Sequence, residues 1–365
     1  MKKLFSLALV LAVGFGAAGC SPVTQTPAPQ SPSPAPSVSA PAAPSPSESA
    51  SPSPSASQPA ASVKTMKIGS TNAKDRAPSQ GFYSFQKYLE AECKTIKVEV
   101  YTDGVLGDDT ATLEGLQMGT IQGSTVSTSP IAALVPSIGV FGLPFLFSDK
   151  ETAYKVLDGP VGQEELDALS GSGIIGLCYW ENGWRHITNS KRPIKTLADL
   201  KGLKIRVMNS PIEVDTWTAL GTNPTPLDFS QLYTALEQKV VDGQENPLGN
   251  VVTKKFNEVQ KYLTLSGHEY SASPFLVSKV FWDSCTPDEQ AAIKDAALKA
   301  RDDERVAAQN EDKTATQTLT AAGMQIDQLN PGEKDKMRAA VQPIYDKYGA
   351  KYGKDLMDKL AAAMK

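Results

Sequence analysis

The sequence predicts an α/β fold with two lobes, and three observations support this. Strand and helix patterns alternate from residue 66 onwards, as expected for a sheet covered by helices. About 300 residues follow a low-complexity N-terminal region, which is more than one ordinary core holds. After Pro287 more than 30 residues contain neither Pro nor Gly and carry apolar residues at helical spacing, which predicts a helix ~50 Å long that could cross both lobes.

The N-terminal region predicts export. Lys2 and Lys3 precede an apolar run at residues 4–15, the pattern of a secretion signal. Residues 17–20 (AAGC) resemble the bacterial lipobox, which implies a signal peptide at 1–19 and a lipidated Cys20. Two or three acyl chains would hold the chain at a membrane. The alternative is ordinary cleavage that leaves a stray thiol.

Residues 20–65 are expected to form the lipidated terminus and a tether. Residues 21–62 hold 12 of the 26 prolines, are otherwise mostly Ser and Ala, and carry one charge, Glu48. Such a composition cannot build a core. In polyproline II conformation the tether would reach on the order of 100 Å. Ligand recognition by this segment is the alternative.

The elements of the body follow from periodicity. The expected strands are 66–68, 96–101, 122–127, 174–180, 203–207, 262–265 and 276–278. The expected helices are 81–91, 108–118, two amphipathic helices ending by residue 170, 230–238, 251–256 and the long helix after Pro287. Thr196 and Asp199 form a capping box that opens a one-turn helix. Asp108 and Asp109 stand where an N-cap and a first-turn acid belong.

Charge and residue content argue against several kinds of chemistry. The body, residues 63–365, carries 34 basic and 39 acidic side chains, a net charge of −5, which disfavours nucleic-acid binding. Two histidines and no Cys or His at metal spacing predict no metal site. The motif GSGIIG at 171–176 follows a helix and leads into a strand, the reverse of a dinucleotide fold, so we interpret it as a turn and expect no cofactor. Cys93, Cys178 and Cys285 could form one disulfide and one free thiol, or remain buried thiols.

Three polar sites stand out. Arg206 lies inside an apolar strand and must be partnered there, either by a ligand carboxylate in a bidentate pair or by a core acid. Arg185 lies in a polar run at 181–186. Asn246 lies in the run DGQENP at 242–247, where it could also cap a helix.

Five motifs, in their order and spacing, resemble the solute-binding subunits of TRAP transporters, the tripartite ATP-independent periplasmic carriers. They are 185–194 (RHITNSKRPI), 200–207 (LKGLKIRV), 233–237 (YTALE), 242–247 (DGQENP) and 258–263 (EVQKYL). The resemblance covers about residues 67–350. It implies an extracytoplasmic receptor with a periplasmic-binding-protein-like fold, in which two lobes close on an organic acid and a long helix spans both. It also implies delivery to a sodium-driven membrane carrier with a small and a large subunit, and no enzymatic activity.

The resemblance also implies ligand contacts. Arg206 corresponds to the arginine that pairs with the ligand carboxylate. The other implied contacts are Arg185, Asn246, Phe229, Asp109, and Thr71 or Asn72. Ser127 is the eighth residue expected at the site. It stands where sialic-acid receptors place a glutamate, which disfavours a nine-carbon sugar acid. A C4-dicarboxylate is favoured, because Arg185, Lys74 and Arg76 could bind a second carboxylate.

Two alternatives remain at this point. The ligand could be a sugar acid such as a uronate, or an oxo acid. The protein could instead be an exported enzyme, for which Asp109, Glu181 and Glu245 are the candidate general bases. The lobes are expected at 66–182 plus about 272–311 and at 183–271 plus about 312–365.

Overall fold

The computed structural model describes residues 63–365. The predicted signal peptide, the lipidated Cys20 and nearly all of the tether fall on residues 1–62 and therefore lie outside the described residues. The first strand begins at Lys64, two residues inside the predicted tether. Among the described residues, no helix combines the length and the apolar content that a bilayer span needs.

Helices and strands alternate along the chain, so the predicted α/β class is confirmed. The strands are β1 Lys64–Gly69, β2 Ile96–Tyr101, β3 Gly123–Thr125, β4 Ile174–Asn189, β5 Lys204–Val207, β6 Asn223–Pro226, β7 Gly243–Pro247, β8 Tyr262–Ser278 and β9 Gln325–Gln328. The α-helices are α1 Ala77–Glu92, α2 Asp109–Met118, α3 Thr128–Ile131, α4 Lys150–Leu157, α5 Pro160–Ala168, α6 Pro211–Ala219, α7 Leu232–Glu237, α8 Leu248–Thr253, α9 Lys279–Ser284, α10 Pro287–Ala321, α11 Glu333–Ala340, α12 Gln342–Tyr352 and α13 Lys354–Ala363. Five short 3-10 helices are η1 Pro136–Gly142, η2 Leu169–Ser172, η3 Leu197–Leu200, η4 Phe229–Gln231 and η5 Phe256–Glu258.

All nine strands belong to one sheet, in the order β2-β1-β3-β8-β4-β7-β5-β6, with β9 paired to β8. A parallel group, β2-β1-β3, forms one end, and β5 pairs in parallel with β6 and β7 at the other. Between these groups run β4 and β8, which are antiparallel to each other and 16 and 17 residues long. The long antiparallel pair therefore connects two separate parallel groups.

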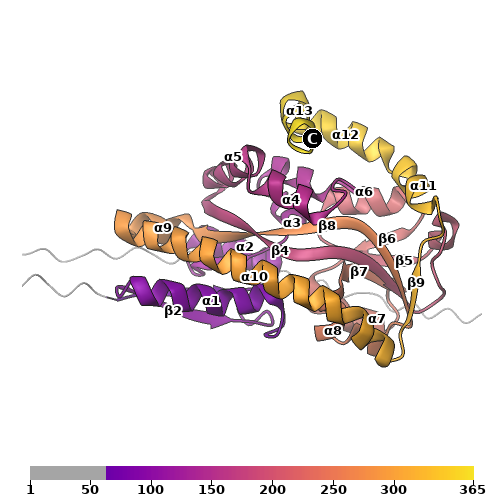
Figure 1. Ribbon diagram of the computed structural model, residues 1–365, viewed down its shortest axis with the longest axis horizontal. Coiled ribbons are helices and arrows are strands. Elements are labelled where there is room, and N and C mark those ends of the chain that lie inside the picture. The colour runs from indigo at the N-terminus through magenta and orange to yellow at the C-terminus, as the bar shows by residue number, and fades with distance from the viewer. Residues whose placement is uncertain (1–62) are drawn as a thin grey trace, which may run out of the picture. The chain divides into compact units, whose positions relative to one another are not determined.

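The long helix predicted after Pro287 is confirmed as α10, with 35 residues. It begins with Thr286 as N-cap and Glu289 as the third helical residue in a capping box, and Pro287 takes the first helical position, where its missing N–H costs nothing. Figure 1 shows α10 in orange, passing from the α9 end of the sheet to α7 and α8, and it contacts α1, β4 and α8 on the way. The helix thus touches elements near both parallel groups.

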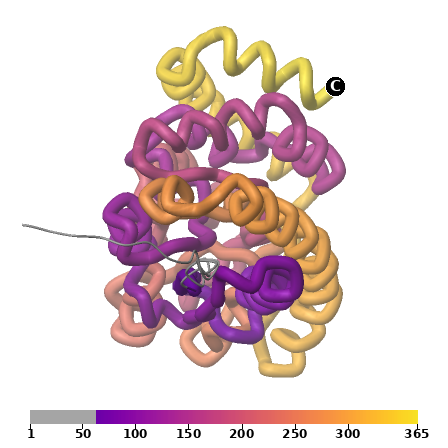
Figure 2. Tube along the Cα trace, turned by 90° about the vertical axis from the view of Figure 1, so that its left-hand side faces the viewer, coloured from indigo at the N-terminus to yellow at the C-terminus, as the bar shows by residue number. Residues whose placement is uncertain are grey.

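Three apolar clusters form the core. One lies under α1 and α10 and includes Phe82, Trp180 and Phe275. A second packs around α7 and α8 and includes Phe256. The third and largest joins the α4–α5 region to the C-terminal helices. These helices are the yellow tube at the top of Figure 2. The described residues belong to one compact unit, and the lobe boundaries given above remain a prediction.

Several element boundaries differ from the expected ones. The predicted strand 174–180 continues to Asn189, and the strands predicted at 262–265 and 276–278 are the two ends of β8. Polar residues interrupt the apolar pattern inside both strands, and three of them, Asn182, Arg185 and Ser273, line the pocket described below. The predicted helix at 251–256 is α8 followed by η5, and Asn246 lies in β7 and caps no helix.

The remaining local predictions agree with the structure. Asp108 caps α2 by accepting a hydrogen bond from the backbone N–H of Ala111 (2.9 Å). The box formed by Thr196 and Asp199 is present. Residues 171–176 comprise the end of η2, the turn at Gly173 and the start of β4. Cys93, Cys178 and Cys285 are buried and unpaired within residues 63–365, and all three belong to the core cluster under α1 and α10.

Candidate functional site

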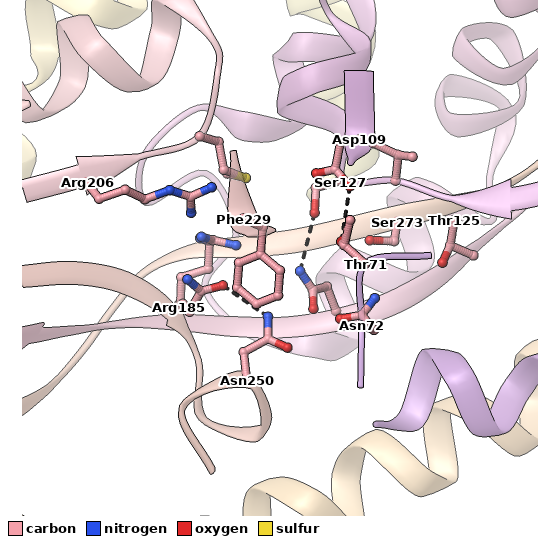
Figure 3. Close-up of a pocket in the computed structure, with 14 residues that line it drawn as sticks. Thr71, Asn72, Asp109, Thr125, Ser127, Arg185, Arg206, Phe229, Asn250 and Ser273 are labelled. Carbon is pink, nitrogen blue, oxygen red and sulfur yellow. Dashed lines mark hydrogen bonds between the residues drawn. The ribbon is translucent and has the colours of Figure 1, made fainter. Parts of the chain in front are cut away.

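One pocket gathers all eight ligand-binding residues that the sequence predicted. It encloses about 390 Å³ that protein atoms do not fill, part of it open to solvent. Figure 3 shows the guanidinium groups of Arg206 and Arg185 on one side and the polar groups of Asp109, Ser127 and Thr71 on the other. The lining residues are Thr71, Asn72, Asp109, Thr125, Val126, Ser127, Asn182, Arg185, Arg206, Met208, Phe229, Asn246, Asn250 and Ser273.

The topology explains why these residues meet. Thr71 follows the carboxyl end of β1, Ser127 follows that of β3, and Arg206 lies one residue before the carboxyl end of β5. Ligands of open α/β sheets bind outside the carboxyl ends of parallel strands, because there the loops diverge and leave a crevice. The two parallel groups thus supply opposite walls of one pocket.

A β-bulge brings two residues of β4 to the same pocket. Asn182 and Arg185 are three positions apart, so a regular strand would direct them to opposite faces. Glu181 pairs with Ala272 and Gly183 pairs with Ser271, which leaves Asn182 as an extra residue. Gly183 has a φ of +115°, which a residue with a side chain rarely adopts. The bulge therefore allows both polar side chains to line the pocket.

Arg206 is buried, with 3% of its surface exposed, and carries no acid partner. Among residues 63–365 its only hydrogen bond runs from Nε to the carbonyl oxygen of Leu227 (2.9 Å), and no carboxylate forms an ion pair with it. Burial lowers the pKa of Arg206 to about 10, so the group is still charged at neutral pH. Both terminal nitrogens are therefore available for an anion in the pocket.

Arg185 is equally buried but already paired. Its Nε and Nη2 donate to the two carboxylate oxygens of Glu245, with Nη2 at 2.8 Å, and Nη2 also donates to the Glu245 backbone carbonyl. Burial alone would raise the pKa of Glu245, but Arg185 and His268 lower it to about 2. The charge of Arg185 is thus neutralised by Glu245.

Asp109 is the one carboxylate among the residues that line the pocket. Thr71 Oγ1 donates to its Oδ1 (3.1 Å). Burial raises the pKa of Asp109 to about 6, although Thr71 and the charge of Arg206 act in the opposite direction. Asp109 can therefore exchange a proton near neutral pH. It is both the first-turn acid of α2 and a pocket residue.

The other predicted contacts lie around this charged centre. Phe229 comes from η4, and the Arg206 guanidinium carbon lies 5.9 Å from its ring centroid. Asn246 comes from β7, and its Oδ1 accepts from Asn250 Nδ2 (3.0 Å). Asn72 borders the pocket beside Thr71, and Ser127 accepts a hydrogen bond from Asn182 Nδ2 (3.3 Å).

Sequence reasoning missed six lining residues: Thr125, Val126, Asn182, Met208, Asn250 and Ser273. Asn182 lies in the polar run that drew attention to Arg185, and this was a usable signal. Ser273 lies within β8 next to Pro274, in the gap between the two separate strands that the sequence predicted. Asn250 lies on α8, whose first residue was predicted three positions too late. Ser273 and Asn250 therefore could not be placed at the site.

Arg76 and Lys74 do not line the pocket, contrary to their suggested role with a second carboxylate. Arg76 is buried and forms an ion pair with Glu311 of α10. Lys74 is exposed. The candidate bases Glu181 and Glu245 do not line the pocket either. Glu181 accepts a hydrogen bond from the Tyr154 hydroxyl, and Glu245 accepts one from Arg185.

A buried acidic cluster lies behind Arg185. Glu213, Glu245 and Glu269 are each at most 3% exposed, and His268 Nε2 lies 3.2 Å from Glu245. Burial raises the pKa of Glu213 to about 7 and that of Glu269 well above its usual value. Within residues 63–365, the one group of three possible metal ligands is Glu245, His268 and Glu269, with ligand atoms within 4.8 Å of one another. Both carboxylate oxygens of Glu245 already accept hydrogen bonds from Arg185, so the negative charge of Glu245 is balanced by the positive charge of Arg185.

The arrangement as a whole can bind a small anion. One uncommitted guanidinium faces hydroxyl and amide groups, and a single aromatic ring closes one side. A guanidinium offers two parallel N–H donors that match a carboxylate. The site therefore favours an organic acid whose remaining atoms are polar.

Comparison with known proteins agrees with this chemistry. The family described as "Bacterial extracellular solute-binding protein, family 7" matches residues 68–351. A solute-binding protein of Verminephrobacter eiseniae is 37% identical over 305 residues, covering 83% of this chain and 90% of the relative. The 2,3-diketo-L-gulonate-binding periplasmic protein YiaO of Escherichia coli is 34% identical, and the match covers 74% of this chain and 83% of the relative. The C4-dicarboxylate-binding protein DctB of Bacillus subtilis is 34% identical, and the match covers 73% of this chain and 76% of the relative.

Solved structures give the same result. A sugar acid binding protein of Advenella mimigardefordensis in complex with galactonate has a TM-score of 0.81 and 38% identity, covering 83% of this chain and 98% of that one. A TRAP periplasmic solute-binding protein of Polaromonas bound to D-erythronate has a TM-score of 0.79 and 36% identity, covering 82% of this chain and 98% of that one. One from Sulfurospirillum deleyianum with bound succinate has a TM-score of 0.79 and 34% identity, covering 83% of this chain and 99% of that one. The chain is thus a member of family 7 of the bacterial extracellular solute-binding proteins, the small-organic-acid receptors of TRAP transporters.

Proposed function

We propose that this receptor captures a small hydroxylated monocarboxylate, a sugar acid of the aldonate type, and delivers it to the membrane subunits of a TRAP carrier. The observation that carries the proposal is Arg206, a buried cation without an acid partner among residues 63–365. A buried, unpaired charge is costly, and a ligand carboxylate bound in bidentate fashion would remove that cost.

The absence of a second uncommitted cation in the lining favours one carboxylate over two. The sequence favoured a C4-dicarboxylate because Arg185, Lys74 and Arg76 could bind a second carboxylate. Arg185 pairs with Glu245, Arg76 pairs with Glu311, and Lys74 is exposed outside the lining. The rest of the lining offers Thr and Ser hydroxyls and Asn amides, which suit the hydroxyl groups of a sugar acid.

The relatives lend support to both ligand classes. Galactonate and D-erythronate occupy two similar structures, and both are hydroxylated monocarboxylates. A C4-dicarboxylate remains the second candidate, because DctB of Bacillus subtilis is named for such a ligand and another similar structure holds succinate. The pocket chemistry of this chain decides our preference for the first class.

An enzymatic function is the less favoured alternative. Of the three candidate general bases, only Asp109 borders the pocket, and Thr71 donates to it. A receptor returns its ligand unchanged, so mass spectrometry of an acid after prolonged incubation with the protein distinguishes the two functions.

A thermal-shift screen with matched acids tests the ligand class. The panel pairs D-erythronate and D-galactonate with succinate, and adds D-glucuronate, D-galacturonate and 2,3-diketo-L-gulonate. A ligand present at 100 times its Kd stabilises the folded state by ~2.7 kcal/mol, which a melting curve resolves. We expect stabilisation by an aldonate and none by succinate at equal concentration. Stabilisation by succinate alone would support the dicarboxylate candidate.

We further propose that Cys20 carries a lipid anchor and that residues 21–62 tether the body to the membrane. The support is the AAGC sequence at 17–20 and the Ser, Pro and Ala composition of the tether. Cys20→Ala should move the protein from the membrane to the soluble extracytoplasmic fraction. A protein that still sediments with membranes after a high-salt wash would refute the anchor. Deletion of 21–62 should leave the melting temperature unchanged, whereas a drop of several degrees would mean that the tether packs on the body.

A further inference from the structure

Arg76 lies behind the pocket and contacts two residues of its wall. Its Nε donates to Asn250 Oδ1 (2.8 Å), and its Nη2 donates to Asn182 Oδ1 (2.9 Å) and to the Asn182 backbone carbonyl (3.0 Å). Its Nη1 pairs with Glu311. The side chain is 1% exposed, and burial lowers its pKa to about 10, so it stays charged at neutral pH. Its guanidinium thus touches α8, β4 and α10 together.

A guanidinium has donors only, and this fixes the orientation of both amides. Whichever atom of Asn250 or Asn182 faces Arg76 must be the carbonyl oxygen. The amide nitrogens, which are donors, must therefore point the other way. Asn250 Nδ2 donates to Asn246 Oδ1 (3.0 Å), and Asn182 Nδ2 donates to Ser127 Oγ (3.3 Å).

The orientation continues beyond Asn250 along a chain of buried side chains. Each member accepts from the one before it and donates to the next. The last member donates to the backbone carbonyls of Asp242 and Val259, which can only accept. The chain runs from donor to acceptor through Arg76, Asn250, Asn246, Gln244, Thr188 and Gln260.

A donor-only group at one end and acceptor-only groups at the other give the chain a single favourable direction. Reversing any amide would place two carbonyl oxygens or two N–H groups against each other in a buried site, which costs the free energy of unsatisfied polar groups. Asn182 Nδ2 also donates to Ser271 Oγ (3.4 Å), so both of its N–H groups are used within the wall. Ser127 accepts from Asn182, so its own proton stays available to the pocket. This hydroxyl and the spare N–H groups of Asn246 and Asn250 suit the oxygen atoms of an acid.

We propose that Arg76 is a positioning residue of the pocket, although it does not line it. It fixes which way the amides of Asn182, Asn246 and Asn250 face. As a result Asn246 and Asn250 present N–H donors to a ligand, and Asn182 leaves the Ser127 hydroxyl free to donate. This inference rests on the proposed function in one respect, since the donors suit an acid, but the orientation itself needs no ligand.

The first test therefore uses the full-length protein without ligand. Proton–nitrogen NMR with ¹⁵N-asparagine labelling follows the side-chain amide signals of Asn246 and Asn250, assigned with Asn246→Ser and Asn250→Ser. Arg76→Met should shift or broaden both signals. The signal of Asn246 is decisive, because Arg76 does not touch it and a merely local effect would leave it in place. An unchanged Asn246 signal in Arg76→Met would overturn the proposal.

Arg305→Met is the matched control. Arg305 is also buried, with 8% exposed, and it pairs with Asp158 and donates to the Tyr179 carbonyl, but it contacts no pocket residue. Both Asn signals should remain in place in this variant. If Arg305→Met shifts them as much as Arg76→Met does, the effect is a general loss of packing and the proposal fails. Arg76→Lys keeps the charge with fewer donors, and its intermediate shifts provide the same test if Arg76→Met does not fold.

The second test measures affinity for D-galactonate by calorimetry. Arg76→Met should weaken binding by roughly tenfold to a hundredfold, the range expected when hydrogen bonds from a charged group are lost. Arg305→Met should leave the Kd within about threefold. In an Asn250→Ala background, the same Arg76→Met change should cost several-fold less, because one of the two amides it orients is gone. Equal costs in both backgrounds would overturn the proposal.

Failure of the proposed function gives a different result. If neither D-galactonate nor D-erythronate binds the unmodified protein, the ligand class is wrong, while the NMR comparison still decides whether Arg76 orients the amides. If D-galactonate binds and Arg76→Met has no effect on Kd or on the Asn246 signal, the ligand class stands and the positioning role is wrong.

Discussion

Two regions of the pocket each contain a buried arginine, and they differ in whether that charge is free. At the end of β5, Arg206 has no acid partner among residues 63–365. On β4, Arg185 is held by both carboxylate oxygens of Glu245, with Glu213, Glu269 and further buried polar groups behind it. The first region offers charge to a ligand. The second is internally neutralised and holds the wall in place.

The difference arises from strand register. On β7, Glu245 pairs with Ile187 of β4, so it is the diagonal neighbour of Arg185 on the same face. The neighbours of Arg206 on the adjacent strands are Gln244 and Thr225, which are both neutral. Arginine chemistry is the same at both positions, and the acid one strand away decides whether the charge remains available.

The largest effect is expected at Arg206. Arg206→Met removes the group that pairs with the ligand and should weaken binding by ~3–5 kcal/mol, a hundredfold to several-thousandfold in Kd. Arg206→Lys keeps the charge, loses the planar fork and should weaken binding more than about tenfold. Calorimetric titration measures both.

The melting temperature of the ligand-free variants provides the control. Because no core acid depends on Arg206, Arg206→Met should leave this temperature unchanged or raise it. A destabilised ligand-free protein that keeps its affinity would mean that Arg206 is structural, and the contrast with Arg185 would disappear.

Arg185→Met should mainly reduce stability. It leaves Glu245 buried without its ion-pair partner, which costs ~3–5 kcal/mol of folding free energy. Urea unfolding of the ligand-free protein measures this loss. The matched variant Arg185→Met with Glu245→Leu removes both charges and should recover most of it. A stable single variant would show that Arg185 is as free as Arg206.

The acidic cluster behind Arg185 should make stability depend on pH. Burial raises the pKa of Glu213 from 4.5 to about 7. The folded protein then holds a proton that the unfolded chain releases, so this contribution is complete below pH 4.5 and is lost as the pH rises through 7. The contribution is about 3 kcal/mol. The melting temperature should fall between pH 5 and pH 8, and Glu213→Gln should flatten this slope. Equal slopes in both proteins would contradict it.

The smallest expected effect concerns Asp109, which faces the Arg206 region. Its pKa of about 6 should rise when a ligand carboxylate enters the same small pocket, because two like charges disfavour ionisation. Binding near pH 7 should therefore take up a fraction of a proton. Titrations in two buffers with different ionisation enthalpies measure this uptake, and Asp109→Asn should abolish it. Uptake that persists in Asp109→Asn would assign the proton to another group.

The sequence predicted much of this pocket because its residues follow strand ends and motifs. The apolar pattern around Arg206 predicted the strand that holds it. Five motifs identified the family, and the family implied Asn246 and Phe229 as ligand contacts. Which of the two arginines is free to bind a ligand could not be predicted, because this depends on the strand register that places Glu245 beside Arg185. Asn182 was missed for a related reason, since the bulge at Gly183 that turns it into the pocket is a property of strand pairing.

The central claim is that a ligand carboxylate pairs with Arg206. The most direct measurement compares one acid with its own primary amide on the unmodified protein, using the acid that stabilises it most in the screen. The amide keeps the size and the hydroxyl groups but has neither the charge nor the second acceptor oxygen. We predict that the amide binds at least a hundredfold more weakly by calorimetry. Equal affinity of the acid and the amide would contradict the claim.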